Sequence, residues 1–201
     1  ILSYLDHFNQ AHNADVSGWT PWFQHDALLG YVQDSFKLRG IEFGLWRESD
    51  QGLIIPNEPE VALNQLFARF AKETYEDGLL WSWVGEPFPV KASVTDPTRF
   101  VMERTLTAPL GCLTFGVHLN GYVRTRQGIE LWVAKRSQHK PTFPGKLDNM
   151  VGGGQPAGLG LFENLVKECF EEAGISETQA NQAIATGTIS YRHTDGRGLK
   201  R

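Results

Sequence analysis

The segment that constrains this chain most is a run of three glycines, residues 152–154, which a short loop joins to an amphipathic helix. Apolar side chains recur at helical spacing between Leu161 and Ala173, which predicts a helix that packs one face on a sheet. Gly174 follows as a typical left-handed residue after a helix. Strand-like runs, glycine-rich joins and helices in this order favour an α/β layered domain.

The same helix carries three carboxylates close together. Glu168 and Glu172 are four residues apart and project from one face, and Glu171 lies beside them. Their repulsion is destabilising unless a cation lies among them, and such hard oxygen ligands favour Mg²⁺ or Mn²⁺. The alternative is an ordinary solvated acidic face. The spacing and the flanking glycines favour a metal site with these three glutamates as its ligands.

Residues 153–175 resemble the Nudix box, a pattern of a glycine followed at fixed spacings by acids and a final glycine. The positions that fit are Gly153, Glu168, Cys169, Glu171, Glu172, Gly174 and Ile175. Two positions depart, because Leu159 replaces an expected Glu and Lys167 replaces Arg. The resemblance implies a Nudix α/β/α sandwich with a mixed sheet. It also implies a Mg²⁺- or Mn²⁺-dependent hydrolase that cleaves small-molecule diphosphates, with Glu168, Glu171 and Glu172 as its metal ligands and catalytic groups.

In that family the two altered positions help to brace the loop and the helix. Glu163 lies one turn before Lys167, so we expect these side chains to pair and restore the brace, contributing about 0.3–0.5 kcal/mol. The alternative is that Leu159 marks weakened activity, or a module that binds a diphosphate without hydrolysing it.

The sequence around the box, residues 117–123, 131–137 and 140–153, resembles the thiamine-pyrophosphokinase-related Nudix branch. This resemblance implies a smaller N-terminal α+β domain (1–108) before the Nudix domain (109–201). It also implies thiamine diphosphate or its oxidised forms as substrate, with ADP-ribose or another nucleoside diphosphate derivative as the alternative. We expect the chain to end before the Nudix sheet is complete.

Several residues before and within the glycine run are candidates for substrate binding. Basic side chains there can hold phosphate oxygens, and glycines let backbone N–H groups approach a phosphate. These candidates are Lys135, Arg136, Lys140, Gly152, Gly153 and Gly154. Ordinary exposed bases are the alternative for the first three. His118 and Asn120 alternate along a strand and share a face, which predicts either a place in a ligand pocket or a hydrogen-bonded interior.

Composition limits the partners. The net charge of −4, with acids and bases mixed along the chain, argues against nucleic acid. No apolar run approaches the roughly 20 residues of a membrane helix. Cys112 and Cys169 lie far apart, which suggests neither a zinc site nor a disulfide. We expect a cytoplasmic protein with a small-molecule diphosphate as partner, and the oligomeric state stays open.

Outside the box the hydrophobic pattern predicts further elements. Helices are expected over residues 1–12 and 61–78. Strands are expected at residues 22–23, 28–32, 41–46, 52–55, 79–84, 113–124, 129–135 and 187–191. Trp22, Trp46, Trp81 and Trp83 are expected mainly in a buried core, with stacking on a heteroaromatic ring as the alternative.

Overall fold

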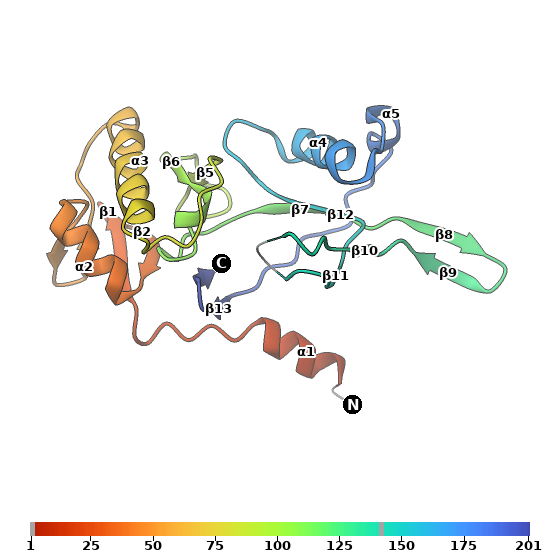
Figure 1. Ribbon diagram of the computed structural model, residues 1–201, viewed down its shortest axis with the longest axis horizontal. Coiled ribbons are helices and arrows are strands. Elements are labelled where there is room, and N and C mark those ends of the chain that lie inside the picture. Colours follow the sequence, from red (N-terminus) through yellow and green to blue (C-terminus); the bar gives the residue numbers. More distant parts are fainter. Residues whose placement is uncertain (1–2, 141–142) are drawn as a thin grey trace. The chain divides into compact units, whose positions relative to one another are not determined.

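The computed structural model describes residues 3–140 and 143–201. Within it the chain divides into two compact units (Figure 1). The first unit combines Ile1–Thr114 with Thr188–Arg201, and the second is Phe115–Gly187. A mixed α/β protein is therefore confirmed, while the predicted division into domains 1–108 and 109–201 stays a prediction.

Residues 188–201 belong to the first unit, whereas the predicted division assigned them to the second domain. Leu199 is fully buried, and its backbone N donates a hydrogen bond to the Ala108 carbonyl at 2.9 Å. The backbone N of Thr114 also donates to the Arg201 carbonyl at 2.9 Å. These bonds attach the antiparallel hairpin β13 (His193–Asp195) and β14 (Gly198–Lys200) to the first unit.

A four-stranded mixed sheet forms the frame of the first unit. Its order is β2–β1–β4–β3, in which β1 and β4 are parallel and the other neighbours are antiparallel. The side chain of Trp22 is fully buried on β1, and its indole N–H donates to the Leu110 carbonyl at 2.7 Å. The four strands are β1 (Thr20–Gln24), β2 (Ala27–Val32), β3 (Arg47–Ser49) and β4 (Gly52–Ile54).

Helix α3 (Glu60–Glu76) supplies much of the first unit's core (Figure 1). Its Leu63, Phe67 and Phe70 are fully buried, and the Phe67 ring lies 6.0 Å from Trp22 and 4.6 Å from Phe100 between centroids. The helix packs on the antiparallel pair β5–β6 mainly through β6. The unit's other elements are α1 (Tyr4–Ala11), α2 (Asp34–Phe43), β5 (Pro87–Val90), β6 (Phe100–Glu103) and the 3-10 helix η1 (Arg104–Leu106).

Three predicted strands are wrong. Residues 41–43 end helix α2, because Gly44 at φ 78° stops that helix in the left-handed conformation. Residues 79–84 have no strand partner: the Glu103 carboxylate instead accepts hydrogen bonds from the backbone N of Val84 (3.1 Å) and Gly85 (3.0 Å). Residues 187–191 are irregular, and pairing begins at His193.

The second unit has strands that pair two by two. Helix α4 packs on the β7–β12 pair (Figure 1). Val151, Cys169 and Ala180 form a small buried core. The pairs are β7 (Gly116–Leu119) with β12 (Val151–Gly154), β8 (Tyr122–Thr125) with β9 (Gly128–Leu131), and β10 (Ala134–Lys135) with β11 (Leu147–Asp148). The helices are α4 (Leu161–Ala173) and α5 (Glu177–Ala180).

The mixed sheet thus belongs to the first unit, and the layered Nudix sandwich expected around the second stays a prediction. The strands predicted at 113–124 and 129–135 are each broken in two, at residues 120–121 and 132–133. Among the helices described, none is long and apolar enough to cross a membrane.

Candidate functional site

Helix α4 is fixed at both ends. At its start the Glu163 carboxylate accepts a hydrogen bond from the Gly160 backbone N at 2.8 Å, which satisfies a free N-terminal donor. At its end Gly174 adopts φ 62°, as predicted, and its N donates to the Phe170 carbonyl at 3.0 Å. Cys169 is fully buried on the inner face, and burial raises the pKa of its thiol, so it packs as a neutral group. The helix is therefore a rigid platform for its acidic side chains.

Three side chains of α4, spaced four residues apart, each contact a different one of three consecutive glycines of β12. The Asn164 amide donates to the Gly154 carbonyl at 2.9 Å, and the Gly152 backbone N donates to the Glu172 carboxylate at 3.1 Å. Between them, Glu168 lies directly over Gly153: a Cβ there would be 2.1 Å from its Cδ. A side chain at this position would therefore displace the Glu168 carboxylate.

Lys167 lies between two of the predicted catalytic carboxylates. Its Nζ is 3.3 Å from Glu168 Oε1 and 3.2 Å from Glu171 Oε2. Burial alone would lower the pKa of Lys167, but its hydrogen bonds and ion pairs with Glu171 and Glu168 outweigh this and raise it. The predicted pairing of Glu163 with Lys167 is wrong, because Glu163 caps the start of the helix instead.

A cavity of about 290 Å³ opens beside the C-terminal half of α4. Three bases and three acids line it, so the opposite charges are balanced across the opening. Such a lining suits an anionic ligand that binds together with a cation, because the anion can lie near the basic side chains and the cation near the acidic ones. The charged residues of the lining are Lys135, Arg136, Lys140, Asp148, Glu171 and Glu172.

Local contacts order the wall of this cavity. Arg136 Nη1 lies 2.6 Å from Asp148 Oδ2 across the β10–β11 pair, and the Lys140 ammonium is 3.9 Å from Glu172 Oε1. Lys140 is half-exposed, so its ammonium is accessible to a bound anion. The structure thus brings three basic candidates to the same cavity as two predicted catalytic glutamates.

The remaining candidates lie next to this cavity and not in its lining. His118 and Asn120 are exposed on one face, and Asn120 accepts a hydrogen bond from the Asn149 side chain at 2.6 Å. His118 is opposite Gly152 in the strand register. The side chain of Glu168 is only 12% exposed, because it lies against the backbone of β12 at Gly153. The predicted interior for His118 and Asn120 is therefore wrong, and a ligand role for them stays a prediction.

The donor set suits a divalent cation, although the three carboxylates are not gathered at one point. Among residues 3–140 and 143–201, no group of three or more His, Cys, Asp or Glu side chains is close enough to hold a metal ion. Glu168 and Glu171 nevertheless share the Lys167 ammonium, so two of the three acids already surround one cation. Carboxylate oxygens are ligands that Mg²⁺ and Mn²⁺ prefer.

Two residues that the sequence patterns missed hold the loop between β12 and α4. The Gln155 side chain donates to the carbonyls of Leu159 (2.7 Å) and Pro156 (3.3 Å), and the Asn164 amide donates to Gly154. Asn164 lies four residues before Glu168 on the same face, and that spacing could have indicated its direction.

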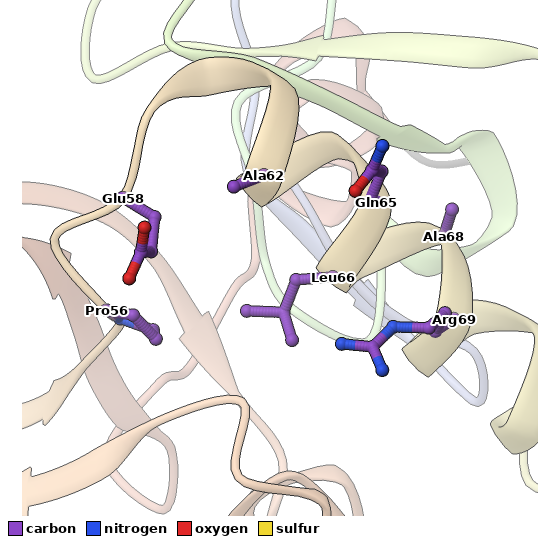
Figure 2. Close-up of a pocket in the computed structure, with 7 residues that line it drawn as sticks. All are labelled: Pro56, Glu58, Ala62, Gln65, Leu66, Ala68 and Arg69. Carbon is purple, nitrogen blue, oxygen red and sulfur yellow. The ribbon is translucent and has the colours of Figure 1, made fainter.

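A larger hollow of about 770 Å³ lies in the first unit, between α3 and the segment before it (Figure 2). Figure 2 shows Leu66 at its centre, with Glu58 and Arg69 as its charged residues. None of the predicted site residues lines it. Trp22 and Trp46 are buried as expected, whereas Trp81 and Trp83 are 41% and 43% exposed and lie outside both hollows.

No family model matches the chain. Over 181 residues, covering 87% of this chain and 49% of the relative, it is 48% identical to Nudix hydrolase 24, chloroplastic, of Arabidopsis thaliana. It is 44% identical over 126 residues (63% of this chain, 34% of the relative) to Nudix hydrolase 20, chloroplastic, of the same plant. It is 33% identical over 139 residues (66% of this chain, 40% of the relative) to an uncharacterised protein of Saccharomyces cerevisiae.

The chain spans about half the length of the first of these relatives and less of the other two. The word chloroplastic in two of the names describes those plant proteins, and the cytoplasmic location expected here stays a prediction. None of the three names specifies a substrate.

Proposed function

We propose that this chain is a Mg²⁺- or Mn²⁺-dependent pyrophosphohydrolase of small-molecule diphosphates, and its similarity to two plant Nudix hydrolases supports this proposal. The observation that carries the proposal is the cavity beside α4, where bases that suit phosphate face Glu171 and Glu172. The proposed catalytic and metal-binding groups are Glu168, Glu171 and Glu172.

The reaction is the attack of water on a phosphorus atom of an X–diphosphate. The bond between the bridging oxygen and phosphorus breaks, X–monophosphate and orthophosphate form, and the proton of the water passes to a carboxylate of α4 as general base. Lys135, Lys140 and Arg136 orient the phosphate oxygens from the cavity wall. Glu168, Glu171 and Glu172 would hold the divalent cation, which would supply charge neutralisation in the transition state and a lowered pKa for the attacking water.

The backbone contacts of α4 prepare this chemistry. The Gly152 N–H orients Glu172 through its hydrogen bond to Oε2, and the bare surface of Gly153 lets Glu168 lie against β12. The two carboxylates are therefore held before substrate arrives, which reduces the reorganisation needed in the transition state.

The proposed substrate is thiamine diphosphate or one of its oxidised forms, which rests on the branch resemblance around the box. The cavity of about 290 Å³ lies at the lower limit of ligand pockets, about 300–1,000 Å³, so it suits the diphosphate end of a substrate. ADP-ribose carries an internal diphosphate, whose hydrolysis gives AMP and ribose 5-phosphate, and it is the second candidate because the cavity lining does not distinguish the two.

A non-catalytic diphosphate-binding module is the competing function. It is favoured by Leu159, which removes an expected acid, and by the absence of a gathered group of three acids among the described residues. The three bases in the cavity lining support diphosphate binding in either case, so a measurement of hydrolysis has to distinguish the enzyme from the binding module.

The test is product formation with Mn²⁺ by the wild type and by Glu172→Gln, measured as release of orthophosphate from thiamine diphosphate and oxothiamine diphosphate and as release of AMP and ribose 5-phosphate from ADP-ribose. Glu163→Gln is the matched control, because it changes an acid on the same helix that caps the helix start. We expect release by the wild type and the control, and a loss of about 100-fold or more in Glu172→Gln.

Binding of these diphosphates without release by the wild type would overturn the enzyme in favour of the binding module. Preference for ADP-ribose over both thiamine compounds would reject the branch assignment and leave the hydrolase.

A further inference from the structure

We infer that Gln155 and Asn164 are positioning residues that set the place of the catalytic glutamates of α4, an inference that rests on the hydrolase function proposed above. Both side chains are amides and both are buried; Gln155 donates to backbone carbonyls of the loop between β12 and α4, and Asn164 donates to the carbonyl of the last residue of β12. Neither occupies a position through which the chain resembles the Nudix box.

Asn164 joins the first turn of the helix to the end of the strand. Its side chain is fully buried, and its amide donates to the Gly154 carbonyl at 2.9 Å. Its backbone N donates to the Gly160 carbonyl, also at 2.9 Å. This backbone bond is the ordinary i to i−4 bond of a helix. The side-chain bond is specific to Asn164 and ties the first turn of α4 to the end of β12, which fixes where the helix begins relative to the strand.

Gln155 closes the loop from the other side. Its backbone N bonds to the Phe115 carbonyl at 2.9 Å, which attaches it to the segment that leads into β7. Its side-chain amide donates to the Leu159 carbonyl at 2.7 Å and to Pro156 at 3.3 Å. The bond to the Leu159 carbonyl fixes the backbone at the position where the Nudix box has a Glu that helps to brace the loop.

The positions of Glu168 and Glu172 depend on this attachment, because both side chains contact β12 from the same face of α4 as Asn164. Asn164, Glu168 and Glu172 are spaced four residues apart, so they lie along one face of α4. Asn164 is fixed on Gly154, and the two glutamates then meet the next two glycines of β12. If the first contact is released, the start of the helix can shift and carry both carboxylates with it.

The free-energy cost of burying these two amide oxygens without a hydrogen-bond partner indicates that the side chains do more than stabilise the fold. Asn164 Oδ1 and Gln155 Oε1 are buried and have no hydrogen-bond partner in the described part of the chain. A buried amide oxygen without a partner is destabilising, and an apolar side chain of similar size would avoid the penalty. The amides are therefore better explained by the loop geometry that their N–H groups impose.

The test uses Asn164→Leu and Gln155→Met, which keep the approximate volume and remove the hydrogen bonds. Asn164→Asp is a second variant of matched size, in which an oxygen replaces the donating group. The matched control is Asn64→Leu in the first unit, where Asn64 Oδ1 accepts a bond from the Val101 backbone N at 2.7 Å. The measurements are kcat, KM, the affinity for Mn²⁺ by electron paramagnetic resonance, and hydrogen exchange of the Gly152 amide without metal.

We expect the variants at Gln155 and Asn164 to bind Mn²⁺ about 10- to 100-fold more weakly and to lose kcat by a similar factor, with KM within about twofold. Exchange of the Gly152 amide should rise by about tenfold or more, because its partner Glu172 is displaced. Asn64→Leu should leave all four measurements unchanged even where its melting temperature falls.

Wild-type values of Mn²⁺ affinity and of Gly152 exchange in the variants would overturn the inference. If the wild type binds Mn²⁺ and hydrolyses no diphosphate, the hydrolase proposal fails by itself. The Mn²⁺ affinities and the exchange rates then still decide whether the two amides position the glutamates.

Discussion

Replacing Gly153 by alanine should displace Glu168 and leave the fold nearly intact. A methyl group at Gly153 would lie 2.1 Å from Cδ of Glu168 and 2.4 Å from its Cγ and Oε1. Ordinary contact begins at 3.4 Å, so the carboxylate has to move by about 1.3 Å, the difference between 3.4 and 2.1 Å. The atoms involved belong to the outer part of a flexible side chain, and so the helix backbone can stay in place.

The expected effect on catalysis is much larger than the effect on stability. Misplacing a catalytic group by about 1 Å costs about 100-fold in rate, or about 2.7 kcal/mol of activation free energy. The move also weakens the ion pair of Glu168 with Lys167, whose side chain is 39% exposed. Pairs this exposed contribute about 1 kcal/mol or less to the free energy of unfolding, and salt screens them further.

The assay is kcat for Mn²⁺-dependent orthophosphate release, together with urea unfolding of the same preparations. Gly18→Ala is the control, because a Cβ at Gly18 meets nothing within 4 Å. A kcat for Gly153→Ala within about threefold of the wild type would show that the place of Glu168 over Gly153 is unimportant for the reaction. A loss of unfolding free energy above about 3 kcal/mol would refute the claim that only the side chain moves.

Three further perturbations test separate parts of the structure. Burial alone would raise the pKa of Asp195, but hydrogen bonds from Arg197 and the charge of Lys200 hold it well below its ordinary value. The wild type should therefore melt at a higher temperature than Asp195→Asn, and this difference should be largest above about pH 4 and shrink as the pH falls below that value. A difference at about pH 2 as large as at neutral pH would contradict this. Phe67→Ala, in the fully buried core, should lower the urea-unfolding free energy by about 3–5 kcal/mol, and a loss below about 1 kcal/mol would contradict close packing there. Lys140→Met should raise KM about tenfold with kcat nearly unchanged in steady-state assays, whereas an unchanged KM would remove Lys140 from phosphate binding.

The sequence predicted α4 well because the signals for this helix are local. Apolar spacing set the range from Leu161 to Ala173, and a glycine that can adopt positive φ marked its end at Gly174. The helical spacing of the acids also predicted that Glu168 and Glu172 share a face, and both lie against β12.

Features that depend on distant partners could not be predicted in this way. The hydrogen bonds of Val84 and Gly85 go to the carboxylate of Glu103, so an apolar run that looks like a strand stays irregular. The β13–β14 hairpin joins the first unit through Ala108, about 90 residues earlier in the chain. Gln155 and Asn164 were missed for the same reason: their importance depends on backbone carbonyls that only the folded loop brings near them.

The central claim is that the carboxylates of α4 and a divalent cation together hydrolyse a diphosphate. The most direct measurement is the initial rate of product release with Mn²⁺ and with a chelator: orthophosphate from thiamine diphosphate and oxothiamine diphosphate, and AMP from ADP-ribose. It compares the wild type with the triple variant Glu168→Gln, Glu171→Gln, Glu172→Gln. We predict release from at least one substrate by the wild type with Mn²⁺, none with the chelator, and none by the triple variant. Equal release by the triple variant, or no release by the wild type from any of the three compounds, would contradict the claim.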